Sequence, residues 1–211
     1  MVESALSTAP PELTARARRV SPAAHLADRF AAAAVGGARA VRLREVGFLT
    51  MVGLRAAPGS AAVARLESAL GTPLPSACGS VTAGDDGSVL WLSPDEFLVV
   101  SDEDPTPLTA RLRGALGDEP GSVVDLSANR TTFELAGASA RATLEKGCPL
   151  DLHPRAFEIG TAYVTSIGSV PVVLWRVGEE LYRILPRSSY ADFLGRWLVD
   201  AMAEFRAPEP S

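Results

Sequence analysis

The chain has 211 residues, of which 47% are hydrophobic and 21% are charged, and its formal net charge is −5. This composition is typical of a compact soluble protein, and the negative net charge argues against a nucleic-acid-binding protein. No apolar stretch reaches the ~20 residues that a membrane-spanning helix needs. The first residues include Glu3 and no apolar segment typical of a secretory signal, so we expect a cytoplasmic protein.

The two ends of the chain differ in composition from the rest. Residues 1–22 are rich in Pro, Ser, Ala and Thr and predict a flexible N-terminal arm, and residues 207–211 predict a frayed tail. Between them we expect a single domain over residues 23–206. This domain begins with a short helix over His25–Val35, which ends at two consecutive glycines.

The first half of the domain, about residues 42–118, alternates apolar runs with helical patterns. Turn-forming glycines and prolines separate the segments, and Gly71 is placed to end the first long helix. The predicted order is strand, helix, strand, strand and helix: Glu45–Leu54, Ser60–Leu70, Val89–Leu92, Phe97–Val100 and Pro107–Leu116.

The second half, about residues 121–205, predicts the same order of elements. They are Arg130–Leu135, Ser139–Lys146, Val172–Arg176, Leu181–Leu185 and Ser189–Phe205. The two strands form a hairpin, and the last helix carries an apolar stripe of Phe193, Trp197, Leu198 and Met202.

Matching residues in the two halves indicate an internal duplication. Trp91 and Trp175 are 84 residues apart (175 − 91), and so are Glu96 and Glu180 (180 − 96). We therefore predict an α+β fold made of two β-α-β-β-α units that pack together, because neither half can cover both faces of a small sheet alone.

The residues that could carry chemistry form no recognisable catalytic or metal-binding set. Cys78 and Cys148 have no neighbouring histidine and are expected to be buried or half-buried thiols. His25 and His153 are isolated from any cluster of carboxylates or cysteines, so no spacing supplies the three ligands that a metal site needs. We expect no catalytic, cofactor-binding or metal-binding residue in this chain.

Several polar and aromatic residues have alternative interpretations. The side chains of Asp95 and Glu96 are expected to diverge from a solvated turn. Asp125, with Ser127 and Arg130, is compatible with a ligand anchor. It is equally compatible with a structural role in which the carboxylate accepts backbone N–H groups and the arginine pairs across the two halves or with a partner.

The tryptophans are compatible with either core packing or interface anchoring. Core packing is favoured for Trp91 and Trp175, which lie on predicted strands of the two halves. For Trp197, on the last helix, both interpretations stay open.

Five segments in this order resemble one family. The segments are REVGFLTMVGLR, LWLSPDEFLVV, VVDLSANRTTFELAG, EKGCPLDLHP and SSYADFLGRWLVDA. Together they are similar to the gamma subunit of heterotetrameric sarcosine oxidase, over about residues 42–204.

The resemblance implies a complex of alpha, beta, gamma and delta subunits. Such a complex demethylates sarcosine oxidatively to glycine, reduces oxygen to hydrogen peroxide, and yields methylenetetrahydrofolate or formaldehyde. It implies FAD, covalent FMN, NAD, tetrahydrofolate and zinc on the other subunits and none on this chain. The expected fold is similar to the folate-binding domain of the glycine-cleavage aminomethyltransferase.

One departure from the aminomethyltransferases decides the predicted function. Asp125 and Ser127 match their Asp-x-Ser motif, and Asp151 falls where an aspartate usually follows a helix in that family, which we interpret as a structural turn residue. Val170 and Pro171, however, stand where those enzymes carry paired aspartates. Valine and proline cannot hold or relay a proton, so the resemblance implies a non-catalytic subunit that contributes assembly and stability. The alternatives are a free-standing folate-binding protein and the equivalent subunit of a related N-methyl amino acid oxidase or dehydrogenase.

Overall fold

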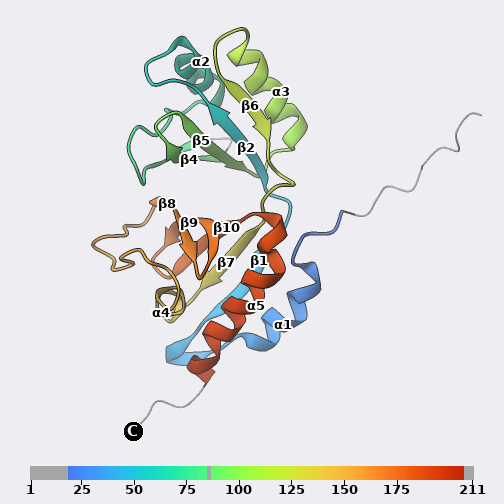
Figure 1. Ribbon diagram of the computed structural model, residues 1–211, viewed down its shortest axis with the longest axis vertical. Coiled ribbons are helices and arrows are strands. Elements are labelled where there is room, and N and C mark those ends of the chain that lie inside the picture. Colours follow the sequence, from blue (N-terminus) through green and yellow to red (C-terminus); the bar gives the residue numbers. More distant parts are fainter. Residues whose placement is uncertain (1–18, 85–86, 207–211) are drawn as a thin grey trace, which may run out of the picture.

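The computed structural model describes residues 19–84 and 87–206 (Figure 1). Most of the predicted arm, residues 1–18, and the predicted tail, residues 207–211, lie outside the described residues. Ser21, within the predicted arm, is held by its hydroxyl, which donates a hydrogen bond to Glu45 Oε2 at 2.6 Å. The backbone N–H of Ala23 donates to the same carboxylate, at 3.0 Å from Oε1.

The described residues contain two five-stranded antiparallel sheets. The first sheet has, in spatial order, β3 (Val81–Gly84), β4 (Gly87–Ser93), β5 (Glu96–Ser101), β2 (Thr50–Arg55) and β6 (Ser122–Asp125). The second has β1 (Arg42–Val46), β7 (Thr132–Ala136), β10 (Leu181–Pro186), β9 (Val170–Gly178) and β8 (Ala162–Ile167). The α-helices are α1 (Ala27–Ala33), α2 (Ala61–Leu70), α3 (Pro105–Leu116), α4 (Ala140–Glu145) and α5 (Ala191–Met202). Short 3-10 turns are η1 (Ala24–Leu26), η2 (Gly37–Arg39), η3 (Ser188–Tyr190) and η4 (Ala203–Arg206).

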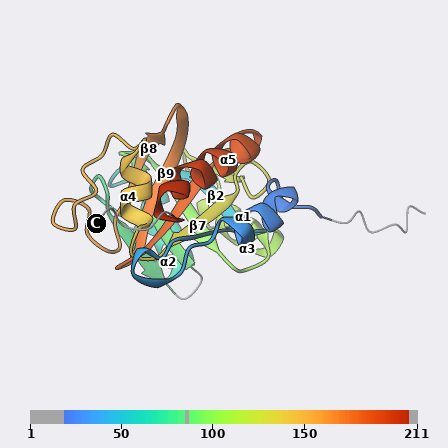
Figure 2. The same cartoon turned by 90° about the horizontal axis from the view of Figure 1, so that it is seen from below.

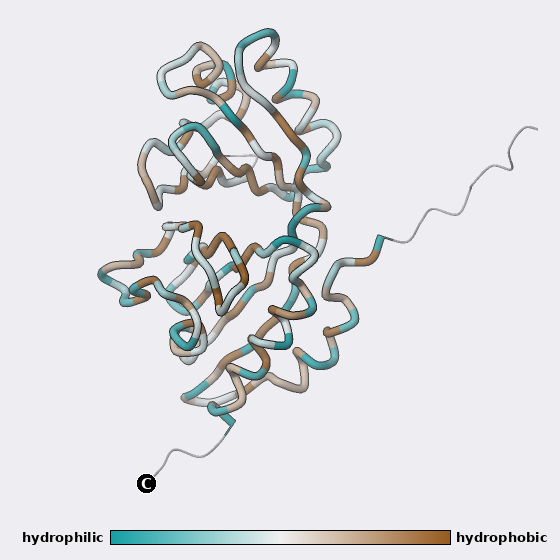
Figure 3. Tube along the Cα trace, viewed as in Figure 1, coloured by the Kyte–Doolittle hydropathy of each residue, from teal (hydrophilic) through white to brown (hydrophobic). Residues whose placement is uncertain are grey.

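The elements stack as helices, sheet, sheet and helices (Figures 1 and 2). Helices α2 and α3 cover the outer face of the first sheet, and α1, α4 and α5 lie on the second. Apolar residues follow the strands of both sheets (Figure 3). A separate cluster, which includes Met51, Leu98 and Trp175, joins the inner faces of the two sheets. This inter-sheet core makes the two halves one body and confirms the α+β class.

The connectivity refines the predicted repeat. Each half contains a fourth strand that sequence analysis missed, β3 in the first half and β8 in the second, so the repeated unit is β2-α2-β3-β4-β5-α3 and then β7-α4-β8-β9-β10-α5. Strand β1 comes before β2 in the chain but pairs with β7 in the other sheet. Strand β6 comes before β7 but pairs with β2. The halves therefore exchange one strand each, which ties the two sheets together through the backbone.

The single strand predicted over Glu45–Leu54 is wrong. The chain leaves β1 at Val46, turns at Gly47 and Phe48, and enters β2 in the other sheet at Thr50. Phe48 has a φ of 67°, a conformation that an aromatic residue rarely adopts. The apolar run continues through Leu49–Leu54 because its residues face two different cores: Leu49 and Met51 face the inter-sheet core, and Val52 and Leu54 face the core beneath α2 and α3. The length of this run led to the prediction of one strand instead of two.

The matched tryptophans do not face the same layer. Trp91, on β4, packs against the core beneath α2 and α3, whereas Trp175, on β9, belongs to the inter-sheet core. A shift of one residue in strand register moves a side chain to the opposite face, and both hairpins contain an irregularity, at Trp91/Ser93 and at Leu181/Tyr182. Both tryptophans do pack in cores, as predicted.

The predicted helix boundaries are close to those observed. Ser60 caps α2, since its Oγ accepts a hydrogen bond from the N–H of Val63 at 3.4 Å, and Gly71 ends the helix with a φ of 67°. In α5 the predicted apolar stripe is partly wrong. Leu198 and Met202 are fully buried, but Phe193 is 53% exposed.

Candidate functional site

Val170 and Pro171, the two positions at which the resemblance implies a loss of paired aspartates, lie at the start of β9. The turn Gly168–Ser169 joins β8 to β9, and Val170 and Pro171 pair with Ile167 and Ser166. Val170 is 2% exposed and belongs to the core beneath α5, whereas Pro171 is exposed. A buried alkyl group and a proline ring neither donate nor accept a proton, so this position offers no acid or base.

Trp197 supports this turn from the helical layer. A Cβ atom built on Gly147 would lie 2.6 Å from Cζ2 of Trp197, and one built on Gly168 would lie 3.6 Å from its Nε1. The indole is half-buried and packs against the core of the second sheet. Of the two interpretations left open for Trp197, packing within the chain is therefore the observed one.

Asp125 and Ser127 form a polar turn between β6 and β7. Asp125 Oδ1 accepts hydrogen bonds from the backbone N–H of Ser127 at 2.9 Å and from its hydroxyl at 2.6 Å. The Oγ of Ser127 in turn accepts from the N–H of Met51 on β2, at 3.1 Å. The carboxylate thus accepts a backbone N–H, as the structural interpretation predicts, and the Ser127 hydroxyl fastens the turn to β2.

Arg130 lies nearby but bonds elsewhere. Its Nη1 donates to the carbonyl oxygen of Leu185 on β10 at 2.9 Å. Burial, assisted by the positive charge of Arg187, lowers the pKa of Arg130, although a guanidinium stays charged at neutral pH. No ion pair joins Arg130 to Asp125 among the described residues. The three residues therefore do not converge into one ligand anchor.

The acidic turn between β4 and β5 differs from its prediction in one respect. Arg55 on β2 is 3.1 Å from Glu96 Oε2 and 3.9 Å from Asp95 Oδ2. The two carboxylates therefore converge on one arginine rather than diverge. All three side chains are well exposed, so the group is a solvated ion cluster.

His25 contacts one carboxylate that the sequence did not indicate, although it joins no cluster of metal ligands among the described residues. Its Nε2 lies 2.7 Å from Asp192 Oδ1, across 167 positions of sequence, and Arg196 Nε donates to both oxygens of Asp192 at 2.9 and 3.0 Å. The hydrogen bond with His25, followed by that from Arg196, lowers the pKa of Asp192. This exposed cluster joins η1 to α5.

A pH dependence follows from the lowered pKa of Asp192. A carboxylate with a lowered pKa in the folded state stabilises the fold above its unfolded pKa of ~4, and this contribution is lost as the pH falls through the folded value. We expect Asp192→Asn to lower the melting temperature at pH 7. The difference from the wild type should shrink below about pH 4. Thermal unfolding from pH 7 to pH 3 measures this, and a difference that grows on acidification would contradict it.

The two cysteines have different surroundings. Cys148 is buried, as expected, whereas Cys78 is exposed, so the prediction for Cys78 is wrong. Asp151 accepts the N–H of His153 at 2.9 Å, which is the structural turn role expected for it. Within residues 19–84 and 87–206, no three His, Cys, Asp or Glu side chains are grouped as metal ligands.

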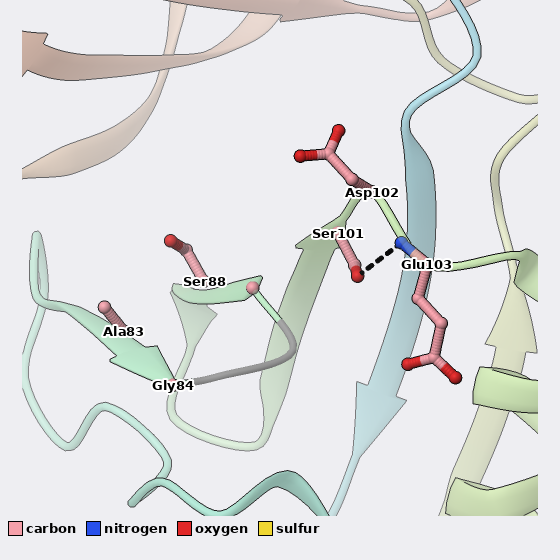
Figure 4. A pocket seen from close by; sticks show the side chains of 7 residues that line it. Ala83, Gly84, Ser88, Ser101, Asp102 and Glu103 are labelled. Carbon is pink, nitrogen blue, oxygen red and sulfur yellow. Dashed lines mark hydrogen bonds between the residues drawn. The ribbon is translucent and has the colours of Figure 1, made fainter.

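A depression of about 370 Å³ lies on the inner side of the first sheet, near the ends of β3, β4 and β5 (Figure 4). The side chains of Ser88 and Asp102 point away from their sheet into the open space. Ser101 is turned the other way, and its Oγ accepts the N–H of Glu103 at 3.0 Å. The depression is polar and shallow, and its described lining residues include two serines and two acids but no His, Cys or Lys that could activate a serine.

Comparison with known proteins gives a consistent result. The model of the sarcosine oxidase, gamma subunit family matches residues 53–204. A sarcosine oxidase subunit gamma from Corynebacterium sp. (strain U-96) is 54% identical over 192 residues, 90% of this chain and 93% of the relative. One from Arthrobacter sp. is 50% identical over 191 residues, 90% of this chain and 93% of the relative.

Solved structures agree with the sequence comparisons. A chain of the heterotetrameric sarcosine oxidase from Corynebacterium sp. U-96, in complex with pyrrole 2-carboxylate, matches with a TM-score of 0.88 and 52% identity, over 92% of this chain and 99% of that one. Glycine cleavage system aminomethyltransferase T from Bartonella henselae matches with a TM-score of 0.58 and 17% identity, over 75% of this chain and 45% of that one. The second likeness concerns the fold alone, and it agrees with the fold expected from the sequence.

In the part of the chain that the structure describes, no helix is long and apolar enough to cross a membrane.

Proposed function

The chain belongs to the sarcosine oxidase gamma subunit family, and we propose that it is the non-catalytic gamma subunit of a heterotetrameric sarcosine oxidase. The observation that carries the non-catalytic part is the start of β9. There the buried Val170 and the exposed Pro171 replace the paired aspartates of the aminomethyltransferases. The fold is kept while the acid–base groups that methylene transfer requires are absent from their usual position.

The proposed complex removes the methyl group of sarcosine to give glycine and reduces oxygen to hydrogen peroxide. The one-carbon unit leaves as formaldehyde or is passed to tetrahydrofolate. In this proposal FAD, FMN, NAD, tetrahydrofolate and zinc belong to the alpha, beta and delta subunits, and the complex lies in the cytoplasm. In this proposal the substrate binds at the flavin, so the flavin-containing subunit, and not this chain, selects the N-methyl amino acid.

The contribution of this chain is assembly and stability of the complex. Two features support a surface that meets a partner. Phe48 is 53% exposed and held at a φ of 67°, and strained residues of this kind persist where function requires them. Val20, which is 73% exposed, lines the same shallow pocket as Phe48, so two large apolar groups are presented together.

Leaving this chain out of a four-subunit co-expression tests the proposal. We expect the remaining three subunits to give no stoichiometric active complex, and adding the gene for this chain back should restore it. Equal complex mass and equal peroxide production without the chain would contradict an assembly role.

Substitution of Asp125 separates a structural carboxylate from a catalytic one. Asp125→Asn keeps an oxygen that accepts the N–H of Ser127, so we expect a stability loss of about 1 kcal/mol or less. Turnover per assembled complex should stay within about twofold, whereas loss of an acid–base catalyst typically costs 10²–10⁴-fold. Peroxide release, normalised to complex by native gel, measures turnover. A fall of more than about tenfold at full assembly would contradict the non-catalytic assignment.

A further inference from the structure

A second pocket lies between α4 and the hairpin of β9 and β10. Its volume is about 230 Å³, and Arg141, Arg176, Glu180 and Tyr182 are among the residues that line it. Sites for drug-sized ligands usually measure ~300–1,000 Å³, so this pocket suits a molecule of only a few heavy atoms. In the sequence, Arg176 marked only the end of a strand, and nothing indicated that α4 lies over it.

Arg176 is a buried cation without a counter-ion. It is 4% exposed, and its guanidinium donates to three carbonyl oxygens: Phe157 at 2.6 Å, Glu179 at 3.0 Å and Gly178 at 3.3 Å. A guanidinium has five N–H donors, so two of them remain unused. No carboxylate lies within ion-pair distance of it among the described residues. A buried charge without an opposite charge is costly, and an anion in the pocket would remove that cost.

Tyr182 also lines the pocket and supplies a hydroxyl group. The residue is 1% exposed, and its ring stacks on Phe157 with centroids 6.2 Å apart. Its hydroxyl makes no hydrogen bond to another described residue, and it is not among the fully enclosed polar atoms that lack a partner, so it is open to the pocket that Tyr182 lines. Burial raises the pKa of Tyr182, so its hydroxyl stays protonated and is able to donate a hydrogen bond to an anion.

The mouth of the pocket carries charges of both signs. Arg141, on α4, is 3.6 Å from Glu145 through Nε, which is too long for a strong hydrogen bond and leaves its terminal N–H groups available. Glu180, at the tip of the hairpin, has an exposed side chain whose negative charge acts on the Tyr182 hydroxyl. A ligand here meets cationic donors at the base and a carboxylate at the rim.

We propose that this pocket binds the zwitterion of a small α-amino acid. The ligand carboxylate accepts hydrogen bonds from Arg176, Arg141 and Tyr182, and the ammonium group pairs with Glu180. A simple carboxylate would contact Arg176, Arg141 and Tyr182 but would leave Glu180 without a cationic partner. A phosphate would be repelled by Glu180 because it brings additional negative charge beside that side chain. The site lies on this chain and goes beyond the proposed role in assembly.

Equilibrium dialysis with radiolabelled glycine tests the proposal on the assembled complex. Complexes that carry the wild-type chain and the Tyr182→Phe chain are compared, so that glycine bound at any other subunit is common to both. Tyr182→Phe keeps the ring that stacks on Phe157 and removes only the hydroxyl. Tyr190→Phe is the matched control, since Tyr190 is exposed on η3, away from the pocket.

We expect the wild type and Tyr190→Phe to bind one more equivalent of glycine than Tyr182→Phe at the same free concentration. Arg141→Gln should weaken this equivalent at least tenfold, whereas Arg196→Gln, on α5, should not change it. Glu180→Gln should weaken glycine but not acetate. Equal glycine binding by the wild type and Tyr182→Phe would overturn the site. Acetate binding as tight as that of glycine would overturn the amino-acid assignment. If the chain is recovered alone, the same dialysis on the lone chain decides the question separately from the assembly role.

Discussion

Replacing Gly137 by alanine is expected to lower the free energy of unfolding by about 3 kcal/mol or more. Gly137 follows β7 and has a φ of 115°, which L side chains rarely adopt. A Cβ atom built there would overlap the backbone carbonyl of Ala40. The N–H of Gly137 also donates to the carbonyl of Glu180 at 2.9 Å, so the backbone cannot move without losing that bond. Denaturant unfolding of the variant measures the loss.

Gly114→Ala is the matched control for this prediction. Gly114 lies inside α3, and a Cβ atom there meets nothing within 4 Å. Alanine favours a helix over glycine by ~1 kcal/mol, so this variant should be as stable as the wild type or slightly more stable. Equal effects of the two substitutions would show that the tight backbone approach at Gly137 is not important for the fold.

Trp175→Ala is expected to destabilise the chain by ~3–5 kcal/mol, the range for deletion of a large buried aromatic side chain. Trp175 is 7% exposed in the inter-sheet core, and the guanidinium of Arg183 lies 5.4 Å from its ring centroid. Loss of the indole would leave a cavity in the inter-sheet core, whose other described members include no aromatic residue. The melting temperature and the denaturant midpoint both report this change.

The variants Trp175→Phe and Trp91→Ala test whether the cost of Trp175→Ala comes from lost packing in the inter-sheet core. The indole Nε1 of Trp175 is buried with no hydrogen-bond partner in the described part, so Trp175→Phe loses no hydrogen bond and should cost far less than Trp175→Ala. Trp91→Ala should also cost less, because Trp91 is only half-buried. If Trp91→Ala proved as damaging as Trp175→Ala, the assignment of the two residues to different layers would lose its energetic support.

Local signals in the sequence predicted local structure well. Ser60 and Gly71 mark the ends of α2 because a hydroxyl cap and a left-handed glycine act within one helical turn. The hairpin of β9 and β10 was predicted because its two strands are adjacent in the chain. Each of these features depends on interactions between residues a few positions apart.

The exchange of strands left no local signal. Nothing in Arg42–Val46 indicates that it pairs with β7, which lies about 90 positions later, because either sheet would bury the same side chains. The equal spacing of the tryptophans predicted the repeat but not the face of each strand, since one bulged residue reverses the face. The pairing of His25 with Asp192 depends on the same long-range packing and was missed for this reason.

The candidate sites also differ in whether they depend on local sequence or on long-range packing. The proposed absence of an acid–base pair at Val170 and Pro171 could be predicted from the sequence because it depends on residue type alone. The pocket at Arg176 and Tyr182 is not, because it needs α4 to lie over the end of a distant hairpin. Burial of an arginine without a carboxylate partner becomes apparent only in three dimensions.

The most direct test of the central claim is native mass spectrometry of this chain, tagged and recovered from its own cells. The account predicts a stoichiometric complex of four different subunits that is yellow with bound flavin and releases hydrogen peroxide when sarcosine is added. Recovery of a lone, colourless protein that binds folate tightly would contradict it and favour a free-standing folate-binding protein.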